Sequence, residues 1–187
     1  DWSSDVCSSD LDAHYAYISS GTWSLMGAEI DAPMLGAGAL EHNFTNEGGV
    51  GRTFRFLKNI MGLWLVQECR RQWEREGQAL DYAELTAMAS QAPAFSAVVD
   101  PDDERFIAPG DMPARLRTVC RETDQAVPDG PGDVVRVALE SLALKYRYVF
   151  ESLEHLFDRR LERIHIVGGG IQNRLLCQFT ADRSEEH

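Results

Sequence analysis

A run of three glycines constrains the fold of this chain more than any other feature. Ile164–Val167 is a short apolar run, Gly168–Gly170 follows it directly, and the next residues (QNRLLCQFTAD) have a helical composition. A strand that ends in glycines and opens a helix brings backbone N–H groups close to a phosphate, because glycine has no Cβ in the way. A tight strand-to-helix packing turn is an equal alternative, since the run matches neither GxGxxG nor GxxxxGK[ST].

The first third of the chain carries strand and turn signals. Tyr15–Ser20 and Thr22–Ile30 predict a hairpin around Gly21, and two more short strands are expected around Gly48–Gly51. Residues 31–41 (DAPMLGAGALE) read as a loop because Pro and Gly interrupt them.

Helical periodicity dominates from Lys58 onward. A first helix is expected with Asn59 as its N-cap, a second from the Asp81–Glu84 capping box to about Gln91, a third over residues 112–122 and a long fourth over residues 133–157. Residues 98–103 (VVDPDD) predict a strand that runs into a turn. Strands first and a strand–turn–helix unit last indicate an α/β domain.

Both ends of the chain differ in character from the segment between them. Residues 1–11 (DWSSDVCSSDL) and 183–187 (RSEEH) are what opposite strands of one common sequencing-library adapter would encode. We therefore expect both segments to be adapter-derived artefacts, and residues 12–182 to form one domain interrupted on both sides.

Composition excludes several classes of function. The formal net charge is −12, and no basic stripe offers the clustered Lys and Arg that a nucleic acid or an anionic membrane needs. Cys69, Cys120 and Cys177 lack the spacing of a zinc site, so we expect no metal held by protein side chains. Scattered thiols and the absence of a secretory signal favour a cytoplasmic location, and no apolar run is long enough for a membrane span.

A second candidate for phosphate binding is the bend Ser19–Ser24 (SSGTWS). Hydroxyls and a glycine in a hairpin bend can present O–H and N–H donors to phosphate oxygens. The alternative is plain turn chemistry, which such residues serve more often.

Several stretches, taken in order, resemble the FGGY family of carbohydrate kinases. Two of them, LKNIMGLWL and DPDD, are more particular to its rhamnulokinase branch. The matching stretches are YISSGTWSLMG (17–27), TNEGG (45–49), LKNIMGLWLVQECRR (57–71), DPDDERF (100–106), CRET (120–123), ESLALKY (140–146) and IHIVGGGIQNRLLCQFTAD (164–182).

The resemblance implies an actin/hexokinase-like (ribonuclease H-like) ATPase fold, of which this chain is the truncated C-terminal half. In that family the sugar lies between two domains, so the missing N-terminal domain is the natural intramolecular partner. The implied reaction moves a phosphate from MgATP to the 1-hydroxyl of L-rhamnulose, with Mg²⁺ carried by the nucleotide. The residues implied to bind ATP are Ser20, Gly21, Thr22, Gln67, Gly168, Gly169, Gly170 and Asn173, and Asn59 is implied to touch the sugar.

The resemblance also implies what this chain lacks. The family's general-base aspartate lies in an HDT-type stretch upstream of SSGTW, and its first phosphate loop lies near the true N-terminus. Asp12 is not that base, and we expect the chain alone to be inactive. Two alternatives stay open, namely an FGGY kinase for another ketose or polyol and a non-catalytic α/β binding domain.

Overall fold

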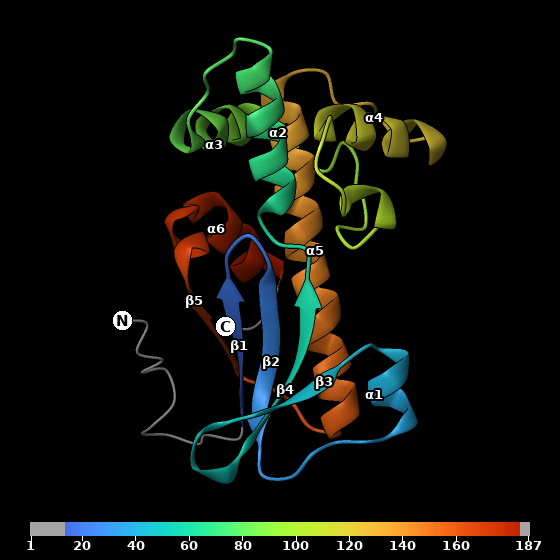
Figure 1. Ribbon diagram of the computed structural model, residues 1–187, viewed down its shortest axis with the longest axis vertical. Coiled ribbons are helices and arrows are strands. Elements are labelled where there is room, and N and C mark those ends of the chain that lie inside the picture. The colour runs from blue at the N-terminus through green and yellow to red at the C-terminus, as the bar shows by residue number, and fades with distance from the viewer. Residues whose placement is uncertain (1–13, 184–187) are drawn as a thin grey trace.

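Five strands form one mixed sheet in the order β3-β4-β2-β1-β5 (Figure 1). The strands are β1 (Tyr15–Ser20), β2 (Ser24–Ile30), β3 (Thr45–Gly48), β4 (Phe54–Ile60) and β5 (Arg163–Val167). The central neighbours pair antiparallel, whereas β1 and β5 run parallel. The computed structural model describes residues 14–183, so Asp12 and the expected adapter-derived segments, apart from Arg183, lie outside the described residues.

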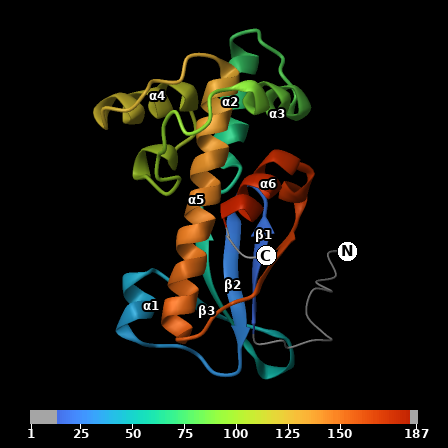
Figure 2. The same cartoon turned by 180° about the vertical axis from the view of Figure 1, so that it is seen from behind.

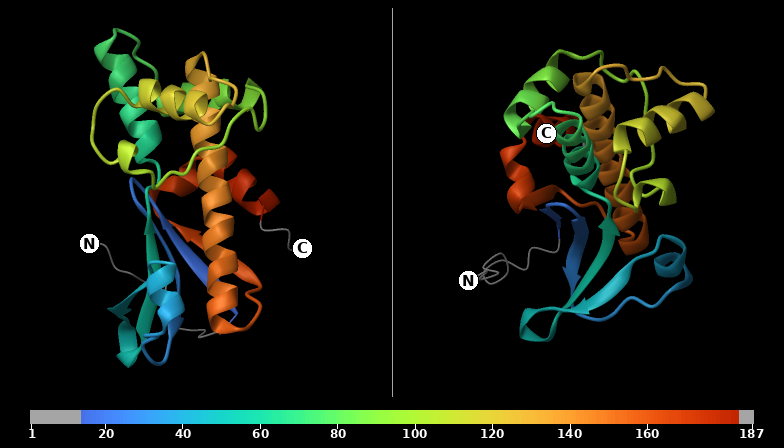
Figure 3. Two further views of the ribbon diagram at one scale, coloured as in Figure 1. Left: turned by 90° about the vertical axis from the view of Figure 1, so that its right-hand side faces the viewer. Right: turned by 45° about the horizontal axis from the view of Figure 1, so that its top comes forward.

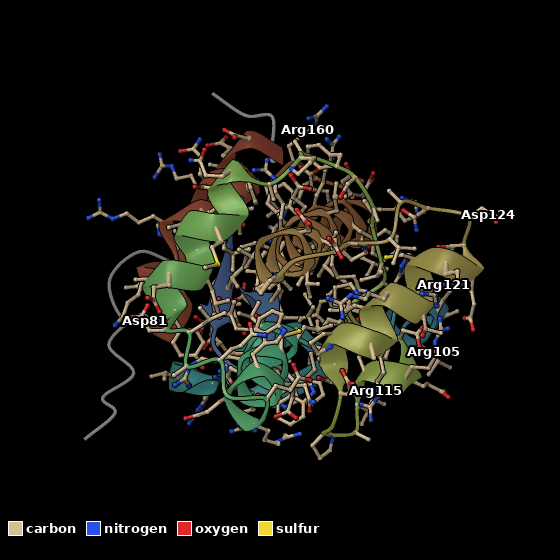
Figure 4. The ribbon with its side chains drawn as sticks, turned by 90° about the horizontal axis from the view of Figure 1, so that it is seen from above. Asp81, Arg105, Arg115, Arg121, Asp124 and Arg160 are labelled. Carbon is tan, nitrogen blue, oxygen red and sulfur yellow. The ribbon has the colours of Figure 1, made fainter. Side chains whose placement is uncertain are left out.

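Six α-helices and three short 3₁₀ turns complete the described part of the chain. The helices are α1 (Ala37–Glu41), α2 (Trp64–Arg75), α3 (Tyr82–Gln91), α4 (Met112–Glu122), α5 (Pro131–Phe157) and α6 (Arg174–Arg183). The 3₁₀ turns are η1 (Val50–Arg52), η2 (Glu104–Phe106) and η3 (Gly169–Gln172). Seen from above, α3 with Asp81 at its start and α4 with Arg121 near its end lie on opposite sides of the molecule (Figure 4).

The long helix α5 organises the core. Its N-terminal half lies among α2, α3 and α4, and its C-terminal half lies along one face of the sheet (Figure 2). The Asp133 carboxylate accepts a hydrogen bond from the Gly130 amide at 3.1 Å, and Pro131 stands in the first turn, which together start the helix. Asp158 ends it in a left-handed conformation. Fourteen of its residues are buried, which makes α5 the main wall of the core, as the sequence predicts.

The helices leave one face of the sheet uncovered. Views along the sheet show α5 and α6 on the same side, and no described helix lies over the other side (Figure 3). Strand β1 alternates accordingly, since Ala16 and Ile18 are buried in the core whereas Tyr15 and Tyr17 are half-buried. Within residues 14–183, none of the helices combines the length and the apolar character that crossing a membrane requires.

Four of the predicted elements are confirmed almost to the residue. The Asp81–Glu84 capping box starts α3, α4 covers residues 112–122, α5 ends at Phe157, and residues 164–167 belong to β5. The hairpin and the two strands on either side of Gly48–Gly51 are also present.

The predicted helix start at Lys58 and Asn59 is wrong. Both residues belong to β4, which pairs with β2 from Ile30↔Phe54 to Ser24↔Ile60, and α2 begins only at Trp64. The apolar run continues from the strand into the helix, so periodicity alone does not place the boundary. Pairing across seven positions decides in favour of the strand.

Two further expectations also fail. Residues 98–103 form no strand, because side chains take the place of a neighbouring strand: Gln125 bonds both the N–H and the C=O of Val98, and the Ser141 hydroxyl accepts from the Val99 N–H at 3.0 Å. The expected loop 31–41 contains the short helix α1.

Candidate functional site

The two glycine-containing segments singled out by the sequence meet at one edge of the sheet. Strands β1 and β5 are parallel neighbours, and their last pair in register is Ser19↔Val167. The bend 21–23 follows β1 and the glycines 168–170 follow β5, so the two segments lie side by side at the upper end of these strands in Figure 1. Two segments about 145 residues apart in the chain thus share one location.

Contact between the two segments is close enough to require glycine. Gly168 has φ of +90°, and a Cβ on it would lie 2.6 Å from the carbonyl oxygen of Ser20. A Cβ on Gly170, which is buried, would lie 2.0 Å from the Ser20 Oγ. Gly169 differs, because it is exposed and nothing lies within 4 Å of its hypothetical Cβ. The loop therefore packs on β1 through its outer glycines and leaves the middle one open.

The start of α2 holds the bend from the other side. The amide of Gly21 donates to the carbonyl of Trp23 at 3.1 Å, which closes the turn. The carbonyls of Gly21 and Thr22 then accept from the amides of Leu63 and Trp64 at 2.9 and 3.0 Å. These bonds satisfy amides at the N-terminus of α2 that have no partner within the helix.

Thr22 and Gln67, predicted from the resemblance to share a site, are in direct contact. The Gln67 Nε2 donates to Thr22 Oγ1 at 3.0 Å, and Thr22 Oγ1 lies 3.2 Å from Gln67 Oε1, to which it can donate. The side chain of Gln67 thus reaches the bend from the first turn of α2.

Asn173 and Asn59 lie near this edge in different settings. The Oδ1 of Asn173 accepts from the amide of Leu176 at 3.0 Å, so this side chain caps α6 directly after the glycine loop. Asn59 pairs with Leu25, one position from the Ser24↔Ile60 pair next to the bend. It is exposed whereas Ile60 is fully buried in the core, so Asn59 belongs to the uncovered face of the sheet.

Tyr146 is the residue at this edge to which the sequence assigned no role. It lies on α5, is 1% exposed, and its hydroxyl is 2.6 Å from Ser24 Oγ and 3.5 Å from Ser20 Oγ. Burial raises the pKa of Tyr146, while the hydrogen bonds to the two serines act in the opposite direction. The only signal in the sequence is its place in the ESLALKY stretch.

Other sites of potential chemistry lie away from this edge. A cavity of about 160 Å³ lies between α5, β5 and α6, lined among others by Ile164, Ile166, Cys177 and Thr180, and it includes none of the candidate residues. In the part of the chain that the structure describes, no three His, Cys, Asp or Glu side chains gather as a metal site. The groups that the candidate edge offers to a ligand are backbone amides, hydroxyls and carboxamides.

Comparison with known proteins gives one family and several relatives. The model of the FGGY family of carbohydrate kinases, C-terminal domain, matches residues 16–185. A rhamnulokinase of Bacteroides thetaiotaomicron is 49% identical over 172 residues, covering 92% of this chain and 35% of the relative. A rhamnulokinase of Enterococcus faecalis is 48% identical over 170 residues, covering 90% and 34%. The chain spans about a third of the length of these curated relatives.

Solved structures share the fold at low sequence identity. Xylulose kinase from Rhodospirillum rubrum superposes with a TM-score of 0.63 at 16% identity, covering 92% of this chain and 34% of that one. Glycerol kinase from Plasmodium falciparum, solved with ADP, gives a TM-score of 0.57 at 15% identity, covering 91% and 34%. These likenesses confirm the expected sugar-kinase fold.

Proposed function

This chain belongs to the FGGY family of carbohydrate kinases, and from that premise we propose that its glycine-lined edge holds the phosphates of ATP. The observation that carries the proposal is that the bend 21–23 and the glycines 168–170 meet at the carboxyl ends of two parallel strands. Ligands of open α/β sheets bind at that end of the strands. Backbone amides can approach a phosphate at Gly169 because nothing occupies the space beside it.

Each candidate residue has a proposed role at this edge. Gly21 closes the bend that lines the phosphate site. Gly168–Gly170 present backbone to the phosphates, and the Thr22 hydroxyl donates to a phosphate oxygen. Gln67 orients Thr22, and Ser20 supports both glycine segments. Asn173 lines the nucleotide site at the start of α6. We expect Mg²⁺ to be bound through the nucleotide, where it neutralises charge on the phosphates.

The parent reaction that we propose is L-rhamnulose plus ATP giving L-rhamnulose 1-phosphate plus ADP. Its support is the 48–49% identity to two proteins named rhamnulokinase. The hydroxyl at C1 of the sugar attacks the γ-phosphate, and its proton passes to a general base that we place upstream of this chain. Asn59 touches the sugar from the uncovered face of the sheet. We place the enzyme in the cytoplasm.

Nucleotide binding is testable on the chain itself. Saturating MgADP should raise the unfolding temperature, since ligand at 100 times its Kd stabilises by about 2.7 kcal/mol. Thr22→Val should weaken nucleotide affinity about tenfold or more, because a hydrogen bond to a charged group is worth about 1.5–3 kcal/mol. Thr118→Val is the matched control, since Thr118 is exposed on α4 and, within residues 14–183, its hydroxyl bonds to the Ala114 carbonyl alone.

Two results would contradict the nucleotide proposal. One is an unfolding temperature that MgADP and MgATP leave unchanged. The other is nucleotide affinity that Thr22→Val and Thr118→Val alter equally.

Kinase turnover should differ between the isolated chain and the full-length protein. Coupled ADP release with L-rhamnulose, L-fuculose and D-xylulose should show no turnover by the isolated chain, because a positioned base alone contributes about 10²–10⁴ in rate. A chain extended upstream to the length of its relatives should turn over L-rhamnulose fastest. Turnover by the isolated chain would refute our placement of the base.

A further inference from the structure

Two serines flank the candidate phosphate-binding bend and point toward α5. Ser20 ends β1, Ser24 begins β2, and the two are direct partners in the antiparallel register. Partners in a ladder project to the same face of a sheet. Both serines are almost completely buried, at 2% and 0% exposure. Their shared face is the one that α5 covers, since the Tyr146 hydroxyl of α5 lies 3.5 and 2.6 Å from the Oγ atoms of Ser20 and Ser24. Figure 2 shows α5 along one face of the sheet.

The hydroxyl of Tyr146 reaches both serines from α5. It is 2.6 Å from Ser24 Oγ, a short hydrogen bond, and 3.5 Å from Ser20 Oγ, at the limit of one. One side chain of α5 therefore holds the two strand ends from which the bend arises.

The same serines lie beneath the other two segments of the candidate site. Ser20 supports the glycine loop, because hypothetical Cβ atoms on Gly168 and Gly170 would contact its carbonyl and its hydroxyl. Ser24 supports the turn into α2, because a Cβ on Gly62 would lie 2.5 Å from Ser24 Oγ. The bend, the glycine loop and the α2 turn thus rest on one buried hydroxyl cluster, defined here as Ser20, Ser24 and Tyr146.

Hydroxyls in this position are directional rather than merely space-filling. A phenyl ring and two methyl groups would fill nearly the same volume, whereas each buried hydroxyl is costly unless it is hydrogen-bonded. In a low-dielectric interior a satisfied network fixes relative orientation more strictly than apolar contact does. A site that binds phosphate through backbone amides depends on such fixed orientation.

We propose that Tyr146 is a positioning residue that, through Ser20 and Ser24, fixes the bend 21–23 and the glycine loop 168–170 relative to each other. Its role in nucleotide binding rests on the proposed function above, whereas its role in holding the edge does not. The hydroxyl of Tyr146 touches neither nucleotide nor sugar, since it is buried beneath the bend.

Hydrogen exchange on the folded chain tests the positioning role directly. In Tyr146→Phe, the bonded amides of Gly21, Leu63 and Trp64 should exchange about fivefold faster or more, relative to amides in α3 and α4. Ser152→Ala is the matched control, since it removes a buried hydroxyl from the same helix. Among the residues that the structure describes, this hydroxyl bonds to the Tyr148 carbonyl alone. It should leave the three bend amides unchanged.

A second variant keeps the test decisive if Tyr146→Phe folds poorly. Ser24→Ala removes the partner instead of the phenol and should accelerate the same amides. If Tyr146 acts through Ser24, the double variant should be no worse than the more severe single one, because residues that form one bond are not additive. Equal acceleration of bend, α3 and α4 amides, or strictly additive effects, would overturn the proposal.

Nucleotide affinity then distinguishes this inference from the proposed function. If the unaltered chain binds MgADP, Tyr146→Phe should raise its Kd about fivefold or more and Ser152→Ala should not. Binding by the unaltered chain with an unchanged Kd in Tyr146→Phe would overturn the link to nucleotide binding. If the unaltered chain does not bind MgADP, the proposed function fails, and the exchange result alone decides whether Tyr146 fixes the edge.

Discussion

At the scale of single residues, the adjacent glycines Gly169 and Gly170 should differ in whether they tolerate an added methyl group. We expect Gly170→Ala to lower the free energy of unfolding by about 1–3 kcal/mol, the usual cost of overpacking. The added methyl would lie 2.0 Å from Ser20 Oγ, which is buried and has little room to move. Gly169→Ala is the control and should be nearly neutral, because its space is open. Urea unfolding measures both, and equal midpoints would contradict this account of the loop.

Residue identities at the site could be predicted only in part. Gly168–Gly170, Thr22 and Gln67 came from motifs, and the structure brings them to one edge. Tyr146 was missed because a tyrosine in a helical pattern is most simply a core residue. Its partners lie more than 120 residues away, and sequence spacing carries no information on a contact of that range.

At the scale of elements, one lysine ties α5 to the DPDD segment. Lys145 Nζ lies 2.8 Å from Asp100 Oδ1 and 3.0 Å from Asp102 Oδ2, and Asp102 Oδ1 accepts from the Met61 amide just after β4. Replacing the lysine leaves the partly buried carboxylate of Asp102 without its ion-pair partner. We expect Lys145→Met to lower the free energy of unfolding by about 1–2 kcal/mol at neutral pH.

Arg147→Met is the control for this prediction. It breaks an exposed pair with Glu151 on the same helix and should lower the free energy of unfolding by less than about 1 kcal/mol.

The penalty for Lys145→Met should depend on pH in one direction. Burial acts to lower the pKa of Lys145, but hydrogen bonds to Asp100 and Asp102 outweigh it, so the pKa lies above its ordinary value. A raised lysine pKa stabilises the fold fully below the unfolded pKa of about 10.4, and this stabilisation is lost as pH rises through the folded pKa. The difference in free energy of unfolding between the unaltered chain and Lys145→Met should therefore be constant from pH 7 to about 9 and shrink above about 10.5. Urea unfolding at several pH values measures this difference, and a difference that grows with pH would contradict the predicted direction.

At the scale of the whole molecule, fold class was predictable and several boundaries were not. Strong local signals such as the Asp81 capping box and the periodicity of α5 fixed their elements. The strand order and the boundary between β4 and α2 depend on pairing between distant segments, which local pattern does not encode. Residues 98–103 have strand-like composition, yet Gln125 and Ser141 satisfy their backbone, so composition misled the prediction.

We expect the uncovered face of the sheet to make the isolated chain prone to self-association. Tyr15, Tyr17 and Leu25 are half-buried on the face that no described helix covers, and exposed apolar surface of this kind drives association. Sedimentation velocity should show a mass that rises with concentration, and Leu25→Glu should shift the chain toward monomer. Leu40→Glu is the control, because Leu40 is 84% exposed but lies on α1, which packs through Gly38 against Leu156 of α5. A single monomeric boundary at high concentration, or equal rescue by both variants, would show that this face does not drive association.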